Sequence, residues 1–165
     1  MSDWQKDKRW SDKFIPEIKR NLGEFLIGEP EPEEDAERNT DLIILKLDSV
    51  RIASRIRTFK FFEMAKNEFT VRSKRPSGVK TELAKIIEGW GDYFFYGFAS
   101  ESESGLYAWR ILSLNVFRLW FNRELCGLDK YKTPGVVKTN ADKSSSFHVF
   151  NILKIPNIIK ARSAL

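Results

Sequence analysis

The chain has 165 residues, of which 42% are apolar and 31% are charged, a composition that excludes intrinsic disorder and suits one domain spanning residues 1–165. Its 28 basic and 23 acidic residues leave a net charge of only +5, so bulk charge identifies no partner. The single cysteine, Cys126, excludes an intramolecular disulfide and favours a reducing, cytoplasmic setting.

The N-terminal part of the chain predicts a helix followed by an acidic loop. Residues 1–10 are polar and are expected to form a loosely held arm. They lack the apolar segment of a signal peptide. Residues 11–26 carry apolar side chains at helical spacing, with Pro16 suited to the first turn. Residues 28–40 combine prolines with a run of acids, which predicts an exposed acidic loop.

Three strands are expected next, joined as an antiparallel meander. Residues 41–47 are nearly all apolar, and residues 50–57 alternate between apolar and polar side chains. Asp48-Ser49 between them predicts a hairpin turn. Residues 68–74 alternate again and complete the meander.

The remaining elements predict the fold class. They are a helix over 79–88, strands over 92–99 and 106–114, a helix over 116–125, a loop over 130–146, a strand over 147–153 and a short helix or tail over 155–165. The helix after the third strand predicts a crossover back to the same sheet. Polar residues interrupt the apolar stretch 106–121, so we expect no membrane span. The fold class is therefore α+β, with a mixed central sheet flanked by helices.

The sequence lacks the residues of several common sites. One cysteine and one histidine, His148, are too few for a zinc site. No segment matches the P-loop, the glycine-rich dinucleotide pattern or the G-x-S-x-G elbow, so we expect no nucleotide cofactor. Carboxylates with Arg and Lys remain, and these suit either Mg²⁺-dependent phosphodiester chemistry or plain phosphate binding.

Charge is unevenly distributed along the chain. Residues 29–41 contain seven acids and one base, whereas residues 51–85 contain ten bases and three acids. The densest polar run leads from the third strand through Pro76-Ser77-Gly78 to the next helix. There an anion could face the backbone N–H groups of the helix start, surrounded by Arg72, Arg75 and Lys80. The alternative is a solvated basic loop in which Ser77 caps the helix.

The predicted elements follow the order helix, three-strand meander, helix and strand, and Thr40-Asp41 opens an apolar strand. This arrangement resembles the core of the restriction-endonuclease-like, PD-(D/E)XK, nuclease superfamily. The resemblance covers residues 11–99 and implies that Asp41 binds a metal and that Glu17 or Glu24 matches the glutamate of the first helix. Runs such as TDLIIL and KTELAKIIEG also resemble uncharacterised accessory proteins of tailed phages.

The chain departs from the pattern of that superfamily at one motif. The acid-x-Lys tripeptide of its third strand falls on Thr70-Val71-Arg72, or on Ala53-Ser54-Arg55 if the second strand is meant, and both lack the acid. Glu82, with Lys85 one turn on, would then be an acid that has migrated to the following helix.

Three functions are compatible with these patterns. The first is a Mg²⁺-dependent nuclease, with Arg72 or Lys80 stabilising the phosphate and the metal held by Asp41, Glu82 and Glu37. The second is a non-catalytic DNA or RNA binder with a basic sheet face that includes Arg51, Arg55, Arg57, Arg72, Lys74 and Arg75. The third is a protein-interaction module, such as a phage inhibitor of a host enzyme, whose acidic segment 29–37 imitates phosphate charges.

Overall fold

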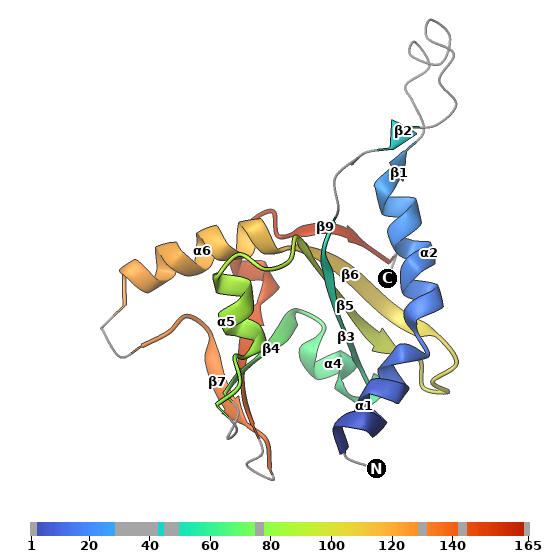
Figure 1. Ribbon diagram of the computed structural model, residues 1–165, viewed down its shortest axis with the longest axis horizontal. Helices are drawn as coiled ribbons and strands as arrows, with labels where there is room; N and C mark the ends of the chain where they lie inside the picture. The colour runs from blue at the N-terminus through green and yellow to red at the C-terminus, as the bar shows by residue number, and fades with distance from the viewer. Residues whose placement is uncertain are drawn as a thin grey trace, which may run out of the picture.

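The computed structural model describes residues 3–28, 43–44, 50–74, 78–128, 132–141 and 145–163 (Figure 1). The helices are α1 (Asp3–Asp12), α2 (Ile15–Leu26), α4 (Phe62–Ala65), α5 (Glu82–Ile87) and α6 (Leu114–Cys126), with short 3-10 segments at Phe59–Phe61 and Ile152–Lys154. The strands are β1 (Ile27–Gly28), β2 (Ile43–Ile44), β3 (Ile52–Arg57), β4 (Glu68–Lys74), β5 (Tyr93–Ala99), β6 (Leu106–Ser113), β7 (Val136–Thr139), β8 (Ser146–Asn151) and β9 (Ile159–Arg162).

The strands of the described residues form two main sheets, and the fold is α+β as predicted. The larger sheet has the order β3-β5-β6-β9 and is mixed, because β3 runs parallel to β5 while the other neighbours are antiparallel. The second sheet has the order β4-β8-β7 and is antiparallel. A two-residue ladder joins β1 to β2.

Strand β5 lies at the centre of the core and is buried on both faces. Phe94, Tyr96 and Phe98 belong to the larger apolar cluster, which also contains residues of β4, β8, α5 and α6. Phe95 and Ala99 point the other way and pack with Phe14 and Ile18 beside and on α2. Figure 1 shows α2 on one side of the mixed sheet, with α5, α6 and the second sheet on the other. Strict alternation along a strand allows one strand to serve both clusters.

The predicted meander is wrong for the described residues. Strand β3 pairs with β5 in parallel register, Ile43-Ile44 of β2 pair with Ile27-Gly28, and β4 lies in the other sheet beside β8. The predicted crossover back to the sheet of the third strand is also wrong, because α5 leads from β4 in the second sheet to β5, which lies beside β3 in the mixed sheet. An alternating pattern specifies a strand and its buried face, but its pairing partner depends on packing with distant segments.

Three predicted irregular segments contain regular structure. Residues 3–12 form α1 in place of a loose arm, and Trp10 Nε1 donates to Glu103 Oε2 at 2.7 Å. Strand β7 lies within the expected loop 130–146, and β9 lies within residues 155–165, which were expected to form a short helix or tail. Residues 29–42, with the acidic segment, lie outside the described part of the chain.

None of the described helices is both long and apolar enough to cross a bilayer. The apolar stretch 106–121 divides between β6 and the first two turns of α6. Its polar interruptions differ in exposure, because Arg110 of β6 is buried whereas Asn115 of α6 is exposed.

Candidate functional site

Two hollows meet between β3 and β4, and both are lined by Arg55 and Arg72. The first, here called the α5 cavity, has a volume of about 380 Å³. The second, here called the hairpin groove, has a volume of about 1010 Å³ and extends toward the β7–β8 hairpin. The α5 cavity is lined by Arg51, Ile52, Ala53, Arg55, Arg72, Lys80, Glu82, Lys85, Ile86, Trp90 and Gly91.

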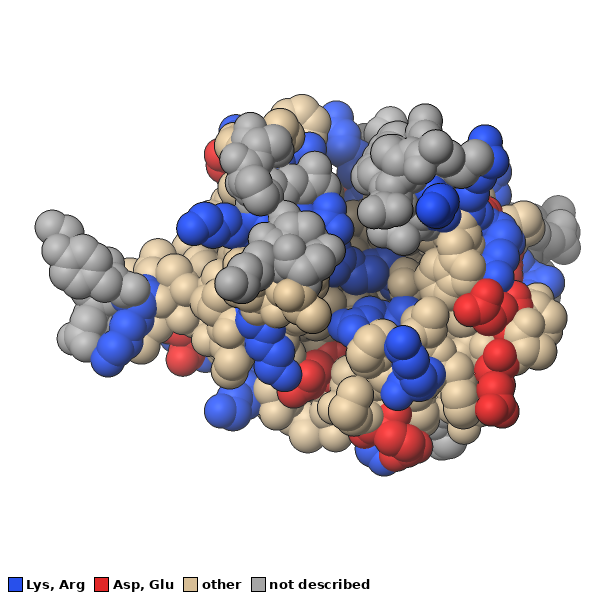
Figure 2. Space-filling view, turned by 90° about the horizontal axis from the view of Figure 1, so that it is seen from below, with Lys and Arg blue, Asp and Glu red and all other residues tan. Residues whose placement is uncertain are grey.

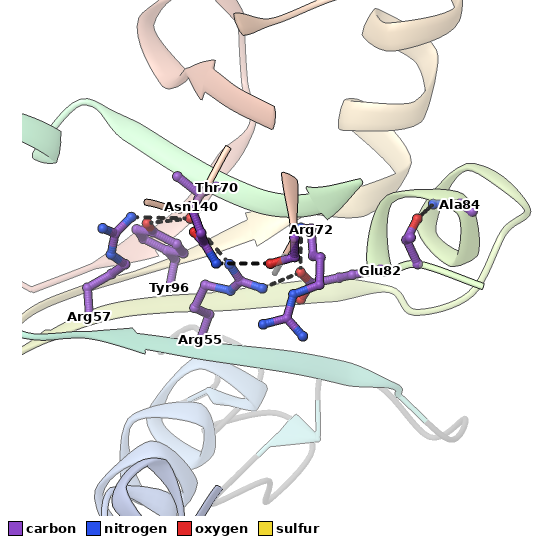
Figure 3. A network of polar contacts seen from close by, with 10 residues as sticks. Arg55, Arg57, Thr70, Arg72, Glu82, Ala84, Tyr96 and Asn140 are labelled. Atoms are coloured by element: carbon purple, nitrogen blue, oxygen red, sulfur yellow. Dashed lines mark hydrogen bonds and ion pairs between the residues drawn. The ribbon is translucent and has the colours of Figure 1, made fainter. Parts of the chain in front are cut away.

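The junction of the hollows is held by one carboxylate. Arg55 Nη2 lies 2.5 Å from Glu82 Oε2, and the backbone N–H of Arg72 donates to the same oxygen at 3.0 Å. Figure 3 shows Arg55 reaching from β3 toward Glu82, the first residue of α5. Both side chains are only 25% exposed, so solvent screens their attraction less than at a free surface. Glu82 thereby ties α5 to an edge strand of each sheet.

A second contact point is Thr70, on β4. Arg55 Nη1 and Arg57 Nη1 each lie 3.4 Å from Thr70 Oγ1, and the Tyr96 hydroxyl lies 3.3 Å from it. The guanidinium of Arg57 also stacks over the ring of Phe61 at 4.2 Å, which is a cation–π contact. These contacts orient the two arginines from β3 into the gap between the sheets (Figure 3).

Directly opposed residues continue this arginine row across the mixed sheet. Arg55 pairs with Tyr96, Tyr96 with Arg110, and Arg110 with Arg162. Paired residues point to the same face, so three guanidinium groups share one face with the Tyr96 ring. Arg110 is 7% exposed, and its pKa is lowered first by burial and then by Arg162, while Tyr96 opposes the shift. Arginine keeps its proton at neutral pH, so the row adds fixed positive charge.

Cations outnumber acids in the lining of both hollows. Figure 2 shows Lys and Arg gathered around and within a hollow on this face. Among the described residues that line the hollows, the only acid is Glu82, and the seven cations are Lys8, Arg51, Arg55, Arg57, Arg72, Lys80 and Lys85. Two of these cations pair with acids outside the lining, Lys80 with Glu88 and Lys8 with Asp12, each at 2.5 Å. The whole chain has 28 bases to 23 acids, so the seven-to-one lining is a local concentration of positive charge.

The structure brings most of the described site residues together. The hairpin groove is lined by Arg57. The α5 cavity is lined by Arg51, Arg55, Arg72, Lys80 and Glu82. Lys74 is exposed at the end of β4 and is not among the described residues lining either hollow. Arg75, Asp41 and Glu37 lie outside the described residues, so the distance between Asp41 and Glu82 stays a prediction.

The helix behind the predicted anion site begins later than expected, and anion binding at its start stays a prediction. Helix α5 begins at Glu82, and Thr81 is its N-cap, with the Ala84 N–H donating to Thr81 Oγ1 at 3.4 Å. Gly78 to Lys80 are irregular and precede the helix, whereas the predicted helix began at Val79. Thr81, rather than Ser77, caps the helix because its extended backbone (φ −82°, ψ 167°) directs the hydroxyl toward Ala84.

The glutamates that the resemblance assigned to the first helix lie away from this site. Glu17 Oε2 accepts the backbone N–H of Leu106 at 2.8 Å, at the start of β6. Glu24 is exposed on α2. Glu17 therefore supports the start of β6, and because α2 packs against the opposite face of the mixed sheet, it is remote from the Arg55–Glu82 pair.

Several lining residues were missed by the sequence patterns. The hairpin groove also contains Trp10, Phe61, Asn140 and Phe147, and the α5 cavity contains Trp90. The signal for Trp90 was present, because glycines on both sides of a tryptophan indicate an exposed turn. The other residues come from segments far apart in the sequence, so no local pattern connects them.

No group of three or more His, Cys, Asp or Glu side chains in the described ranges is arranged to hold a metal ion. Of the three proposed magnesium ligands, only Glu82 falls within those ranges.

Comparison with protein-family models, with curated proteins and with solved structures finds no match to this chain.

Proposed function

We propose that this protein binds nucleic acid, with the phosphodiester backbone lying across the α5 cavity and the hairpin groove. The observation that carries the proposal is the seven-to-one ratio of cations to acids among the described residues of the lining. Phosphate neutralisation by Arg and Lys supplies most of the affinity of sequence-independent nucleic-acid binding.

The aromatic residues in the same lining support a nucleic acid over a small anion. Trp10, Phe61 and Phe147 lie in the hairpin groove among Lys8, Arg55, Arg57 and Arg72. Cations that follow a backbone, interleaved with rings on which bases stack, are typical of single-strand binding surfaces. An inorganic phosphate would need the cations but not the rings.

Mg²⁺-dependent cleavage is the second candidate function. It is favoured by the position of Glu82, whose carboxylate lies in the α5 cavity together with Arg72 and Lys80. A carboxylate beside two cations is suited to hold a metal-bound water near a phosphate. This function also requires Asp41 to approach Glu82 closely enough to share one cation.

The test is a binding and cleavage assay on single- and double-stranded DNA and RNA with Mg²⁺, with Mn²⁺ and with chelator. The proposal is supported if the wild type binds nucleic acid and if Arg55→Ala and Arg72→Ala each weaken that binding. The control is Arg123→Ala, which removes an exposed cation on α6 that lines neither hollow. Absence of binding, or equal loss with Arg123→Ala, would contradict it. Cleavage that Asp41→Ala and Glu82→Ala abolish while binding persists would establish the enzyme.

A further inference from the structure

Trp90 is an exposed aromatic side chain in a cationic cavity. It is 62% exposed, although tryptophan usually buries a large part of its ring, and it lines the α5 cavity. Among the described residues, five cations line that cavity with it: Arg51, Arg55, Arg72, Lys80 and Lys85. An exposed indole leaves apolar surface in contact with water, which is unfavourable. A flat, anionic ligand would cover this ring and meet the charges beside it.

The backbone on both sides of Trp90 is fixed. Gly89 and Gly91 have φ angles of +99° and +83°, which residues other than glycine rarely adopt. The Trp90 N–H donates to the Lys85 carbonyl oxygen at 3.0 Å. A Cβ on Gly91 would lie 3.0 Å from Leu114 Cδ1, so the turn also packs closely against α6.

Arg118 of α6 clamps the same turn. Its Nη1 donates to the Ile86 carbonyl oxygen at 3.2 Å and to the Gly91 carbonyl oxygen at 3.1 Å. Its Nη2 donates to the same Gly91 oxygen at 3.2 Å. These three hydrogen bonds hold the end of α5 and the residue after Trp90. The indole is therefore presented from a rigid turn, which lowers the entropy lost when a ligand stacks on it.

We propose that the α5 cavity accepts one unpaired nucleotide, whose base stacks on Trp90 while its phosphates lie against the surrounding cations. This inference rests on the proposed function and names its ligand class, which is single-stranded nucleic acid or a duplex with an unpaired end. A cavity of about 380 Å³ falls in the size range of small-ligand sites and does not admit a duplex. A duplex also keeps its bases stacked on one another and offers no free face to the indole.

The experiment measures dissociation constants by fluorescence anisotropy for a labelled single strand and for a blunt duplex of the same length. We expect the wild type to prefer the single strand, and Trp90→Ala to weaken that binding about tenfold, the loss of one base stacked on an aromatic side chain. Trp90→Phe should retain most of the affinity because a ring remains. Duplex binding should change less than about twofold in both variants, since backbone contacts alone carry it.

Leu119→Ala is the matched control, because Leu119 is 74% exposed on α6 and lines neither hollow. Circular dichroism melting of each variant confirms folding. Two results would overturn the single-strand inference and leave nucleic-acid binding standing. The first is a wild type that prefers the blunt duplex. The second is a Trp90→Ala variant that binds the single strand normally while Arg55→Ala and Arg72→Ala do not. A wild type that binds neither ligand overturns both proposals.

Discussion

Arg55 Nη2 and Glu82 Oε2 are 2.5 Å apart, and this ion pair joins an edge strand of the mixed sheet to the first turn of α5. The same oxygen accepts the Arg72 N–H, so one acid organises the two arginines that both hollows share. Breaking a half-buried pair by removing one partner leaves the other charge less well satisfied. The role of Glu82 can be tested by changing its charge while preserving its shape.

Glu82→Gln removes the one acid among the described lining residues and keeps an oxygen that can accept from Arg55 and Arg72. At low salt we expect single-stranded DNA to bind about two- to tenfold more tightly, because a like charge near the phosphates is gone. If Glu82 also holds Mg²⁺, cleavage is abolished in the same variant. A loss of binding with unchanged thermal stability would contradict the proposed position of the backbone.

Arg72→Ala should change how binding depends on salt. Each phosphate contact to a single strand contributes a slope of about −0.7 to the logarithm of the association constant against the logarithm of salt concentration. We therefore expect the slope to become shallower by about that amount in Arg72→Ala, and to stay unchanged in Arg123→Ala. Titrations at several NaCl concentrations measure this. Equal slopes in all three proteins would show that Arg72 does not contact phosphate.

His148 should make stability depend on pH. It is 6% exposed, stacks on Phe150 and shares a hydrogen bond of 2.8 Å between its Nε2 and Thr133 Oγ1. Burial lowers the pKa of His148 in the folded protein. The unfolded chain then binds the proton more readily, so the free energy of unfolding falls as pH drops below the ordinary histidine pKa of about 6.5 and levels off below the folded pKa.

Urea unfolding between about pH 7.5 and 5.5 measures this effect, because the window spans the ordinary histidine pKa. His148→Gln should flatten the dependence, since the glutamine amide can replace the contact to Thr133 without titrating. The carboxylates titrate in both proteins and cancel in the comparison. Identical slopes for wild type and variant would rule out His148 as the source.

Gly135 should tolerate no side chain. Its φ is +88°, and an added Cβ would lie 2.7 Å from Phe150 Cε1 and 3.0 Å from the Val149 carbonyl oxygen. We expect Gly135→Ala to lower the free energy of unfolding by about 2–4 kcal/mol, from backbone strain and overpacking together. The measurement is equilibrium urea unfolding.

Gly23→Ala is the matched control for that substitution. Gly23 lies within α2, and its added Cβ would meet no described atom within 4 Å. Alanine should therefore stabilise the protein by about 0.5–1 kcal/mol, since it restricts the unfolded chain and favours the helix. Equal effects of the two substitutions would contradict the packing at Gly135.

The residue pattern predicted the elements whose periodicity is strong. Strand β4 has the predicted bounds, β5 and β6 agree within one residue, and α6 extends the predicted helix by two residues at its start and one at its end. Strand β7 escaped prediction because all four of its residues are exposed and show no apolar alternation. Helix α1 escaped because most of its residues are polar and its stabilising contacts, such as Trp10 to Glu103, are long-range.

The sequence by itself determined the α+β class and singled out Arg55, Arg72 and Glu82, because charge and periodicity are properties of short segments. Only the tertiary structure decided that β3 lies beside β5. It also decided that the Glu82 carboxylate binds Arg55 and Arg72, and that Trp90 lines the α5 cavity with them. Arg55 and Glu82 are 27 residues apart in the chain. Contacts at that separation depend on which buried faces pack together, and this is a property of the whole core rather than of any local pattern.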